Sequence, residues 1–364
     1  MIPMVDLKRQ YHNLKKEIDA AISDVLEETR FILGPNVSAL EEEVAAYHDL
    51  PYAIGVANGT DALLLALRAC GVEAGDEVIT TPFTFIATAE VIALLKARPV
   101  FVDICPDTYN LDCNQIADKI TSKTKAIIPV HLFGHPADMQ PIMEIARKHN
   151  LKVIEDCAQA FGAKYNGKKV GAIGDVGCFS FFPSKNLAGY GDGGMVITKN
   201  EDIARQVKML RNHGSAKRYY HQEIGYNSRL DEIQAAIIRV KLKKIDQFNE
   251  ARRQNAAAYC DAIRGKDIIL PMTVSGCEHV YHQFTIRVKN RDVLAGALQK
   301  KDIASAVYYP VPLHQQEVFL KLYNFSIKLP QSEKCAQEVL SLPMFPELNN
   351  EEIRLIADVI NHAA

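Results

Sequence analysis

Between residues 51 and 200, short apolar runs alternate with longer amphipathic segments, and this alternation limits the possible folds more than any other feature. The runs are five or six residues long: "PYAIGV", "DEVIT", "PVFVD", "KAIIPV" and "LKVIED". Helical patterns separate several of them, among them "DALLLALRAC", "ATAEVIALLKA" and "DMQPIMEIARKHN". Unbroken apolar strands between amphipathic helices are typical of a mostly parallel sheet that is covered on both faces, so the sequence predicts an α/β domain.

The rest of the chain has a different pattern. Two more apolar runs, "VGCFSFF" and "GMVITK", are followed by the long helical patterns "EDIARQVKMLRNHG" and "RLDEIQAAIIRVKLKKIDQF". Beyond about residue 250 the strand-like runs are fewer, "HQFTIRV" and "IASAVYY". We therefore expect a large domain over residues 1–245, with an N-terminal helix able to pack on the second domain, and a smaller α+β domain over residues 246–364.

Charge and composition exclude several classes of protein. The 364 residues include 42 basic and 44 acidic side chains, which gives no electrostatic reason to expect a nucleic acid or membrane partner. No apolar stretch approaches the ~18 residues typical of a membrane helix, and the charged start "MIPMVDLKRQYHNLKKEI" lacks a signal-peptide core. The eight cysteines form no CxxC pair, so we expect reduced thiols and a cytoplasmic protein.

One lysine stands in an unusual context. In "CFSFFPSKNLAGYGDGG", Lys185 separates an aromatic, strand-like run from a group of glycines. An apolar setting lowers the pKa of an amine and makes it a nucleophile. Gly189, Gly191 and Gly194 match the pattern G-x-G-x-x-G, but the strand-like "MVITK" follows them, whereas a dinucleotide site requires a helix. The glycines are therefore expected to let the backbone turn sharply.

A candidate anion site lies in "GVANGTDALLLAL". A strand is expected to end at Ala57, the chain to turn at Asn58 and Gly59, and Thr60 or Asp61 to cap a helix. Free N–H groups at the start of a helix attract phosphate, although an ordinary capped turn has the same pattern.

A candidate carboxylate lies in "KVIEDCAQAFGA". Asp156 ends an apolar strand, where open α/β sheets place ligand-binding groups, and Gln159 follows it by three residues. Asp156 could pair with a cation, assist catalysis or cap a helix. Pyridoxal phosphate chemistry needs a Schiff-base lysine, an anion for the pyridinium nitrogen, a phosphate cradle and a flat group. Lys185, Asp156, the Gly59 turn with Ser180, and an aromatic residue of "TPFTFIATAE" can provide all four.

These motifs occur in an order that resembles the DegT-type nucleotide-sugar aminotransferases, a branch of the fold-type I pyridoxal phosphate enzymes. The likeness extends from "FILGPNVSALEEEVAAY" through "ANGTDALLLAL", "IEDCAQAFGA" and "SFFPSKNLAGYGDGG" to "GYNSRLDEIQAAI" and "YYPVPLH", nearly the whole chain. The resemblance implies two catalytic residues, with the cofactor on Lys185 and Asp156 paired with its ring nitrogen. It also implies that Gln159 lies against the ring and that Phe85 stacks on it.

The same resemblance implies the remaining contacts. Gly59, Thr60 and Ser180 would hold the phosphate together with Asn227, which would reach it across a homodimer interface. Relatives often have histidine at the position of Tyr308, and His314 is a candidate because it follows "YYPVP". The expected substrate-binding residues are Arg229, Tyr308, Tyr309 and His314.

The implied reaction moves an amino group from glutamate to a nucleotide-linked keto sugar. Asp192 in "GYGDGG" is more similar to the branch that acts at C3 than to the C4 branch, while the sugar and its UDP, dTDP or GDP carrier stay open. A sugar dehydratase of the same fold would have histidine in place of Lys185, and a non-catalytic regulatory protein would not need the full set. His131 and His135 lie in an expected loop without a third ligand, so we expect no metal site.

Overall fold

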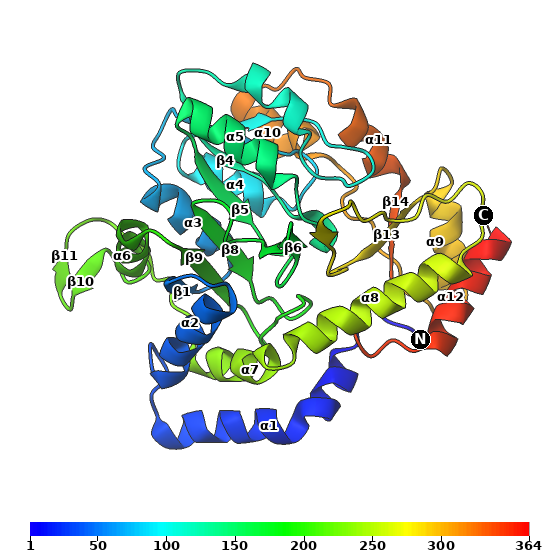
Figure 1. The fold of residues 1–364 in the computed structure, drawn as a ribbon, viewed down its shortest axis with the longest axis horizontal. Coiled ribbons are helices and arrows are strands. Elements are labelled where there is room, and N and C mark those ends of the chain that lie inside the picture. Colours follow the sequence, from blue (N-terminus) through cyan, green and yellow to red (C-terminus); the bar gives the residue numbers. More distant parts are fainter. Residues whose placement is uncertain (364) are drawn as a thin grey trace.

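The computed structural model describes residues 1–363, and its largest element is a seven-stranded sheet (Figure 1). The strands lie in the order β1-β9-β8-β5-β4-β2-β3. Pairing is parallel from β8 to β3, while β9 runs antiparallel to both β1 and β8, so the predicted mostly parallel sheet is confirmed. The bounds are β1 (Tyr52–Val56), β2 (Glu77–Thr80), β3 (Arg98–Phe101), β4 (Thr124–Ile128), β5 (Lys152–Asp156), β8 (Val176–Ser180) and β9 (Gly194–Thr198).

Helices cover both faces of this sheet. Alternate strand residues point to opposite faces, so Ile154 packs in one core cluster and its neighbour Val153 in another. The first face is covered by α3 (Gly59–Ala69), α4 (Ala87–Leu94) and α6 (Glu201–Leu210). The second face is covered by α2 (Pro35–Tyr47), α5 (Met139–His149) and α7 (Glu232–Leu242). The long apolar strand runs of the sequence are therefore explained by burial on both sides.

The N-terminal segment contacts both parts of the molecule. The body of α1 (Leu7–Glu28) packs on α7 through Leu14 and Ile18. Ile2 lies in the core of the C-terminal part, and Arg9 Nη2 pairs with Glu352 Oε1 at 2.6 Å. In Figure 1, α1 runs along the edge of the large part and the N-terminus lies near α12.

A second core lies beyond α8 (Ile245–Ala262), the helix that leaves the large sheet. It contains residues of α8, of the antiparallel pair formed by β13 (Phe284–Arg287) and β14 (Val339–Leu342), and of α9 (Arg291–Gln299) and α12 (Asn350–Ala363). The sequence predicted one helix through residues 229–248, but the chain breaks between α7 and α8 at Lys243 and Lys244.

One predicted strand of this second core is wrong. The run "IASAVYY" at residues 303–309 forms no strand and makes only isolated bridges, from Ile303 to Ile2 and from Ala306 to Ser341 of β14. Pro310 and Pro312 follow the run and lack the N–H groups that would continue a ladder. The strand that pairs with β13 is instead Val339–Leu342, whose four residues are all buried.

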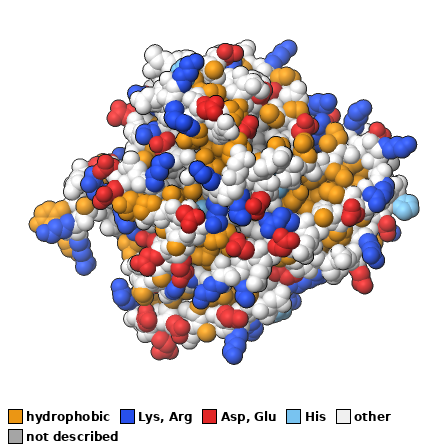
Figure 2. Space-filling model, in the orientation of Figure 1, with side chains coloured by type: hydrophobic (Ala, Val, Ile, Leu, Met, Phe, Trp, Pro, Cys, Tyr) orange, Lys and Arg blue, Asp and Glu red, His pale blue; other side chains and the backbone are white. Residues whose placement is uncertain are grey.

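The remaining elements are short. They are α10 (Glu317–Tyr323), α11 (Pro330–Glu338), β6 (Lys164–Tyr165), β7 (Lys168–Lys169), β10 (Ser215–Lys217), β11 (Tyr220–His221) and β12 (Cys277–Glu278), with 3₁₀ turns η1 (Cys113–Gln115), η2 (Ala117–Lys119), η3 (Leu132–Gly134) and η4 (Leu313–Gln315). The β10–β11 hairpin projects from the body, and Figure 2 shows hydrophobic and basic side chains at its tip. Among residues 1–363, none of the helices is both long and apolar enough to cross a bilayer.

Candidate active site

Three of the predicted site residues, Gly59, Asp156 and Ser180, lie at or just after the ends of β1, β5 and β8. These strands point the same way, because β9 runs antiparallel to both β1 and β8, so their carboxyl ends share one edge of the sheet. Asp156 is the last residue of β5 and Ser180 the last of β8, while Gly59 follows β1. A Cβ on Gly59 would lie 2.7 Å from Ser180 Cβ, so only glycine allows this close approach. The edge is the usual ligand-binding side of an open α/β sheet.

The turn between β1 and α3 leaves donors free at this edge. Asn58 Oδ1 accepts a hydrogen bond from Asp61 N at 2.8 Å, so Asn58 is the cap and the expected cap at Thr60 or Asp61 is wrong. Asn58 is extended and directly precedes the helix, which is the geometry that a capping side chain needs. The N–H groups of Gly59 and Thr60 have no carbonyl partner within α3, because they belong to its first turn. With the helix dipole they favour an anion next to Ser180.

Asp156 is a buried carboxylate with a donor on each oxygen. Its side chain is 5% exposed, Oδ1 accepts from Ala158 N at 3.1 Å and Oδ2 accepts from Thr88 Oγ1 at 2.8 Å. The residues that follow form a turn, so Asp156 caps no helix. Burial raises the pKa of Asp156, whereas the two hydrogen bonds and the charge of Lys185 oppose that rise. A cation placed against this carboxylate would stabilise its ionised form.

Lys185 lies in the turn after β8, where Lys185 N donates to Phe182 O at 2.8 Å. Burial lowers the pKa of the Lys185 amine to about 8, although the Asp156 carboxylate acts in the opposite direction. About a tenth of such amines are unprotonated at pH 7, which is what a nucleophile or a general base requires.

The turn that contains Lys185 is held in place by hydrogen bonds of the next residue, Asn186. Asn186 Nδ2 donates to Asn249 Oδ1 of α8 at 2.8 Å and to Val280 O at 3.0 Å. Asn186 Oδ1 lies 3.2 Å from Nδ1 of His282, a buried ring whose pKa burial lowers well below its usual value. Neither Asn186 nor His282 was predicted as a site residue, because the partners of Asn186 are about 60 and 95 residues away in the sequence.

Gln159, Tyr309 and Phe85 adjoin one another and form one wall of the site. Gln159 Oε1 accepts from Phe133 N at 2.7 Å, and Gln159 Nε2 donates to Tyr309 Oη at 3.0 Å. The ring centroids of Phe85 and Tyr309 are 6.3 Å apart, and Phe85 is 55% exposed. Tyr308 follows, with its ring 5.8 Å from that of Tyr309. An exposed phenyl ring beside an oriented amide and a phenol can contact a planar ligand.

Three predicted residues lie outside this wall. His314 is buried and its Nε2 lies 3.1 Å from Glu333 of α11. Arg229 Nη1 donates to Asn212 Oδ1 at 3.0 Å, and the side chain of Asn227 is exposed. Ser228, between them, accepts from Ala57 N at 3.3 Å, so this segment borders the β1–α3 turn of its own chain.

The histidine pair of the sequence separates in the structure. His131, Glu155 and Cys157 offer ligand atoms within 4.8 Å of one another, whereas His135 is not one of them. Both nitrogens of His131 are occupied, since Nδ1 accepts from Ala137 N at 2.9 Å and Nε2 therefore donates to Glu155 at 3.0 Å. His131 and Glu155 are therefore held in a hydrogen-bond network next to β5.

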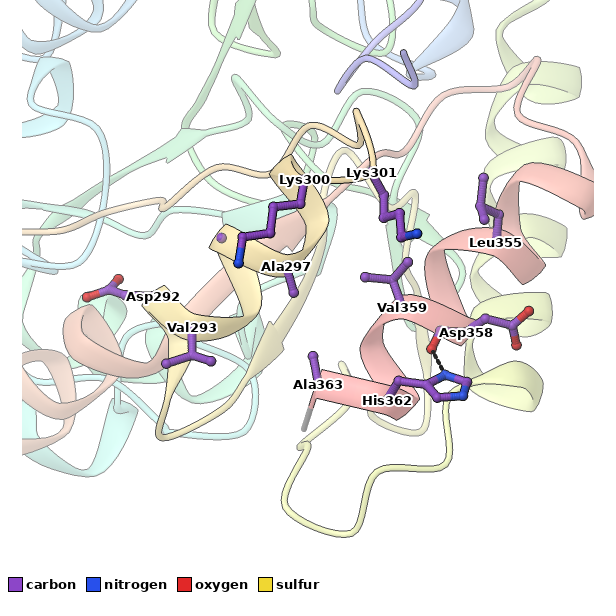
Figure 3. Close-up of a pocket in the computed structure, with 11 residues that line it drawn as sticks. Asp292, Val293, Ala297, Lys300, Lys301, Leu355, Asp358, Val359, His362 and Ala363 are labelled. Carbon is purple, nitrogen blue, oxygen red and sulfur yellow. Dashed lines mark hydrogen bonds between the residues drawn. The ribbon is translucent and has the colours of Figure 1, made fainter.

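A separate cavity of about 730 Å³ lies between α9 and α12. Figure 3 shows Lys300 and Lys301 at one end, with Val293 and Leu355 on its two sides. All of its lining residues belong to the C-terminal core region, and it contains none of the predicted site residues.

The fold, with a lysine, a buried carboxylate and a helix N-terminus at one sheet edge, is that of a fold-type I aminotransferase. The sequence pattern of the "DegT/DnrJ/EryC1/StrS aminotransferase family" matches residues 12–361, and the chain belongs to this family. It is therefore a transaminase.

Three relatives illustrate the similarity. The chain is 51% identical to the "Pleiotropic regulatory protein" of Geobacillus stearothermophilus over 99% of this chain and 97% of that protein. It is 51% identical to the UDP-N-acetyl-3-dehydro-alpha-D-glucosamine 3-aminotransferase of Acidithiobacillus ferrooxidans, again over 99% and 97%. The crystal structure of S. venezuelae DesV in complex with a ketimine intermediate superposes with a TM-score of 0.97, at 42% identity over 99% of this chain and 98% of that one.

Proposed function

We propose that this transaminase moves an amino group from glutamate to C3 of a nucleotide-linked keto sugar. The observation that carries the proposal is the placement of Lys185, with its lowered pKa, at the same sheet edge as Asp156 and the anion-binding turn at Gly59. The similarity to a 3-aminotransferase of a UDP-linked 3-dehydro sugar supports the position on the sugar.

The residues at this edge fit pyridoxal 5′-phosphate. Gly59, Thr60 and Ser180 would hold the phosphate, because they offer two N–H groups and a hydroxyl at a helix N-terminus. Asp156 would face the ring nitrogen, since a buried carboxylate is stabilised by a protonated ring. Phe85 would cover one face of the ring. When bound, the cofactor supplies an electron sink for the amine exchange.

The chain's own groups would position the substrates and move protons. Lys185 Nζ would take the proton from the donor carbon that bears the amine, because its lowered pKa leaves a useful fraction of free amine near neutral pH. Two hydrogen bonds, to Phe133 N and Tyr309 Oη, fix the amide of Gln159. The fixed amide would in turn orient the cofactor ring. Tyr309, Tyr308, His314 and Arg229 are the proposed substrate contacts.

We also propose a homodimer with shared sites. The β10–β11 hairpin projects from the body with Tyr219 78% and Tyr220 65% exposed, and Phe182 beside the lysine turn is 52% exposed. Large apolar groups in such positions are typical of an interface between subunits. The exposed amide of Asn227 would then reach the partner's phosphate site, and Arg229 its sugar nucleotide.

A non-catalytic regulatory role is the second candidate, favoured by the name of one relative at 51% identity. Such a role would not require a carboxylate held on both oxygens beside an amine of lowered pKa. The two candidates differ in whether purified protein produces an aminated sugar.

The test of the reaction is a panel of UDP-, dTDP- and GDP-linked 3-keto and 4-keto sugars with glutamate and pyridoxal phosphate. We expect 2-oxoglutarate and a sugar that carries its new amine at C3 by NMR, and no product from the Lys185→Ala control. Amination at C4 would contradict the position, and cofactor binding without amination of any sugar would favour the regulatory role.

The test of shared sites mixes two inactive proteins. One subunit carries Asn227→Ala with Arg229→Ala, and the other carries Lys185→Ala. If the sites are shared, one site of the mixed dimer collects both defects and the other none, so up to half of the wild-type activity per dimer returns. The contact between Ser228 and Ala57 within one chain supports the alternative, in which Asn227 and Arg229 belong to the site of their own subunit. A verified heterodimer without activity would place Asn227 and Arg229 in the site of their own subunit.

A further inference from the structure

Two threonine hydroxyls and the Asp156 carboxylate form a buried chain that the proposed reaction has not used. Thr88, in the first turn of α4, places Oγ1 2.8 Å from Asp156 Oδ2. Thr84, four residues earlier in the bend before α4, places Oγ1 3.1 Å from Thr88 Oγ1. The three side chains are 1%, 2% and 5% exposed for Thr88, Thr84 and Asp156, so water cannot readily replace these bonds.

The direction of the chain follows from the number of protons. An ionised carboxylate only accepts hydrogen bonds, so the single hydroxyl proton of Thr88 points to Asp156. Thr88 Oγ1 can then only accept from its other neighbour, and Thr84 must donate to it. The order is Thr84 to Thr88 to Asp156, and each bond polarises the next.

The bond from Thr88 acts on both the charge and the orientation of the carboxylate. Burial raises the pKa of Asp156, and among the opposing causes the hydrogen bond from Thr88 is the largest, ahead of the bond from Ala158 N. Thr88 and Ala158 N hold different oxygens, so together they fix the plane of the carboxyl group. A fixed, ionised carboxylate is the partner that a protonated ring nitrogen needs.

Other titratable groups surround Asp156 and must be separated from this effect. Lys185, in the turn after β8, favours the ionised carboxylate. His131, three residues after β4, donates to Glu155, and a positive charge on its ring would act in the same direction. Burial raises the pKa values of the phenol and thiols that also face it, which keeps them uncharged near neutral pH: Tyr309, Cys157 and Cys178.

We propose that Thr88 is a positioning residue, which orients the Asp156 carboxylate and keeps it ionised to receive the protonated ring nitrogen of the cofactor, with Thr84 supporting it as donor. This inference rests on the proposed function and extends it to two residues outside the contacts predicted from the sequence. The hydrogen bonds of the two hydroxyls lead to Asp156, so both threonines would act through that carboxylate.

The experiment measures the affinity of pyridoxamine 5′-phosphate as a function of pH. This probe has the ring nitrogen and phosphate of the cofactor but forms no covalent bond with Lys185, so its dissociation constant reports the non-covalent contacts alone. Equilibrium dialysis from pH 5 to pH 9 gives the pH below which affinity falls, and the part of this fall that Asp156→Asn lacks reports the protonation of Asp156. The proteins are the wild type, Thr88→Val, Thr88→Ser, Thr84→Val and, as reference, Asp156→Asn.

We expect Thr88→Val, which has nearly the shape of threonine, to weaken binding about tenfold at pH 7 and to move the acid limb up by about one pH unit, because a hydrogen bond to a charged group is lost. Thr88→Ser, which keeps the hydroxyl, should restore both. Thr84→Val should move the limb in the same direction by less. If Thr88→Val does not fold, Thr84→Val still tests this series of hydrogen bonds. It keeps the bond from Thr88 to Asp156 but removes the hydroxyl that donates to Thr88.

The possible results separate this inference from the proposed function. If the wild type does not bind the probe, the proposed function fails. If the wild type binds, Asp156→Asn loses affinity, and Thr88→Val keeps the wild-type pH profile, the positioning role is overturned and the proposed function stands. A Thr88→Val protein with a lower melting temperature but an unmoved acid limb would show a purely structural role and would also overturn it.

Discussion

The lowered pKa of Lys185 can be tested without cofactor or substrate. Burial brings the pKa of its amine to about 8, against about 10.4 for an ordinary lysine. At pH 7 this corresponds to about 9% free amine at Lys185 and about 0.04% at an ordinary lysine, a ratio of about 200. The difference disappears only above about pH 11.4, where about 90% or more of both amines is free.

Competitive acetylation with trace acetic anhydride measures this directly. The apoprotein is labelled between pH 6 and pH 11, and peptide mass spectrometry follows Lys185 relative to the other lysines of the same sample. We expect labelling of Lys185 to rise through pH 8 and to level by about pH 9. In Asp156→Asn the inflection should move below pH 8, because the carboxylate raises the pKa of the amine. An inflection near pH 10.4 in the wild type would show that burial does not lower the pKa of Lys185. An upward move in the variant would show that Asp156 does not raise it.

Three further predictions concern other positions. Asp156→Asn should keep the fold by circular dichroism but lower turnover about 100-fold or more, since an oriented charge is lost; wild-type turnover would remove Asp156 from the site. Gly59→Ala should weaken pyridoxamine phosphate binding at least about tenfold, because its Cβ would meet Ser180 Cβ at 2.7 Å. The matched control is Gly296→Ala in α9, where the new Cβ would meet no described atom within 4 Å apart from its chain neighbours and the backbone of its own helix; it should bind normally and raise the free energy of unfolding by about 1 kcal/mol. Lys241 is 1% exposed, its ammonium has no hydrogen-bond partner among residues 1–363, and burial lowers its pKa to about 7. Protonation in the folded state therefore costs stability below pH 7, and this cost lessens as the pH rises towards the unfolded value of about 10.4. Lys241→Met should raise the free energy of unfolding by about 2 kcal/mol at pH 6 and by less at pH 9 in urea titrations, whereas an equal gain at both values would contradict this account.

The large sheet could be predicted from the sequence because its strands are buried on both faces. Continuous apolar runs such as Lys152–Asp156 and Val176–Ser180 therefore stand out against amphipathic helices. The C-terminal core gave a weaker signal. The strand Val339–Leu342 has only four residues and directly follows a helix, so it was missed, and a strand was expected at residues 303–309 instead.

Some residues of the site could likewise be predicted from the sequence, and others could not. Lys185, Asp156 and Gly59 are visible in the sequence because each lies at a strand end with a local pattern around it. Asn58 could have been chosen as the cap, since asparagine is among the strongest N-cap residues. Thr88 and Asn186 have no such local signal, because their roles depend on partners that the fold brings together from distant parts of the chain, Asp156 for Thr88 and Asn249 for Asn186.

Covalent binding of the cofactor to Lys185 can be tested by chemical trapping. The protein is incubated with pyridoxal phosphate, reduced with borohydride and digested, and the peptides are sequenced by mass spectrometry. We predict that the reduced phosphopyridoxyl group is found on Lys185, and that Lys185→Ala shows no such linkage while still binding pyridoxamine phosphate. The group on another lysine of the wild type, or on none, would contradict the account.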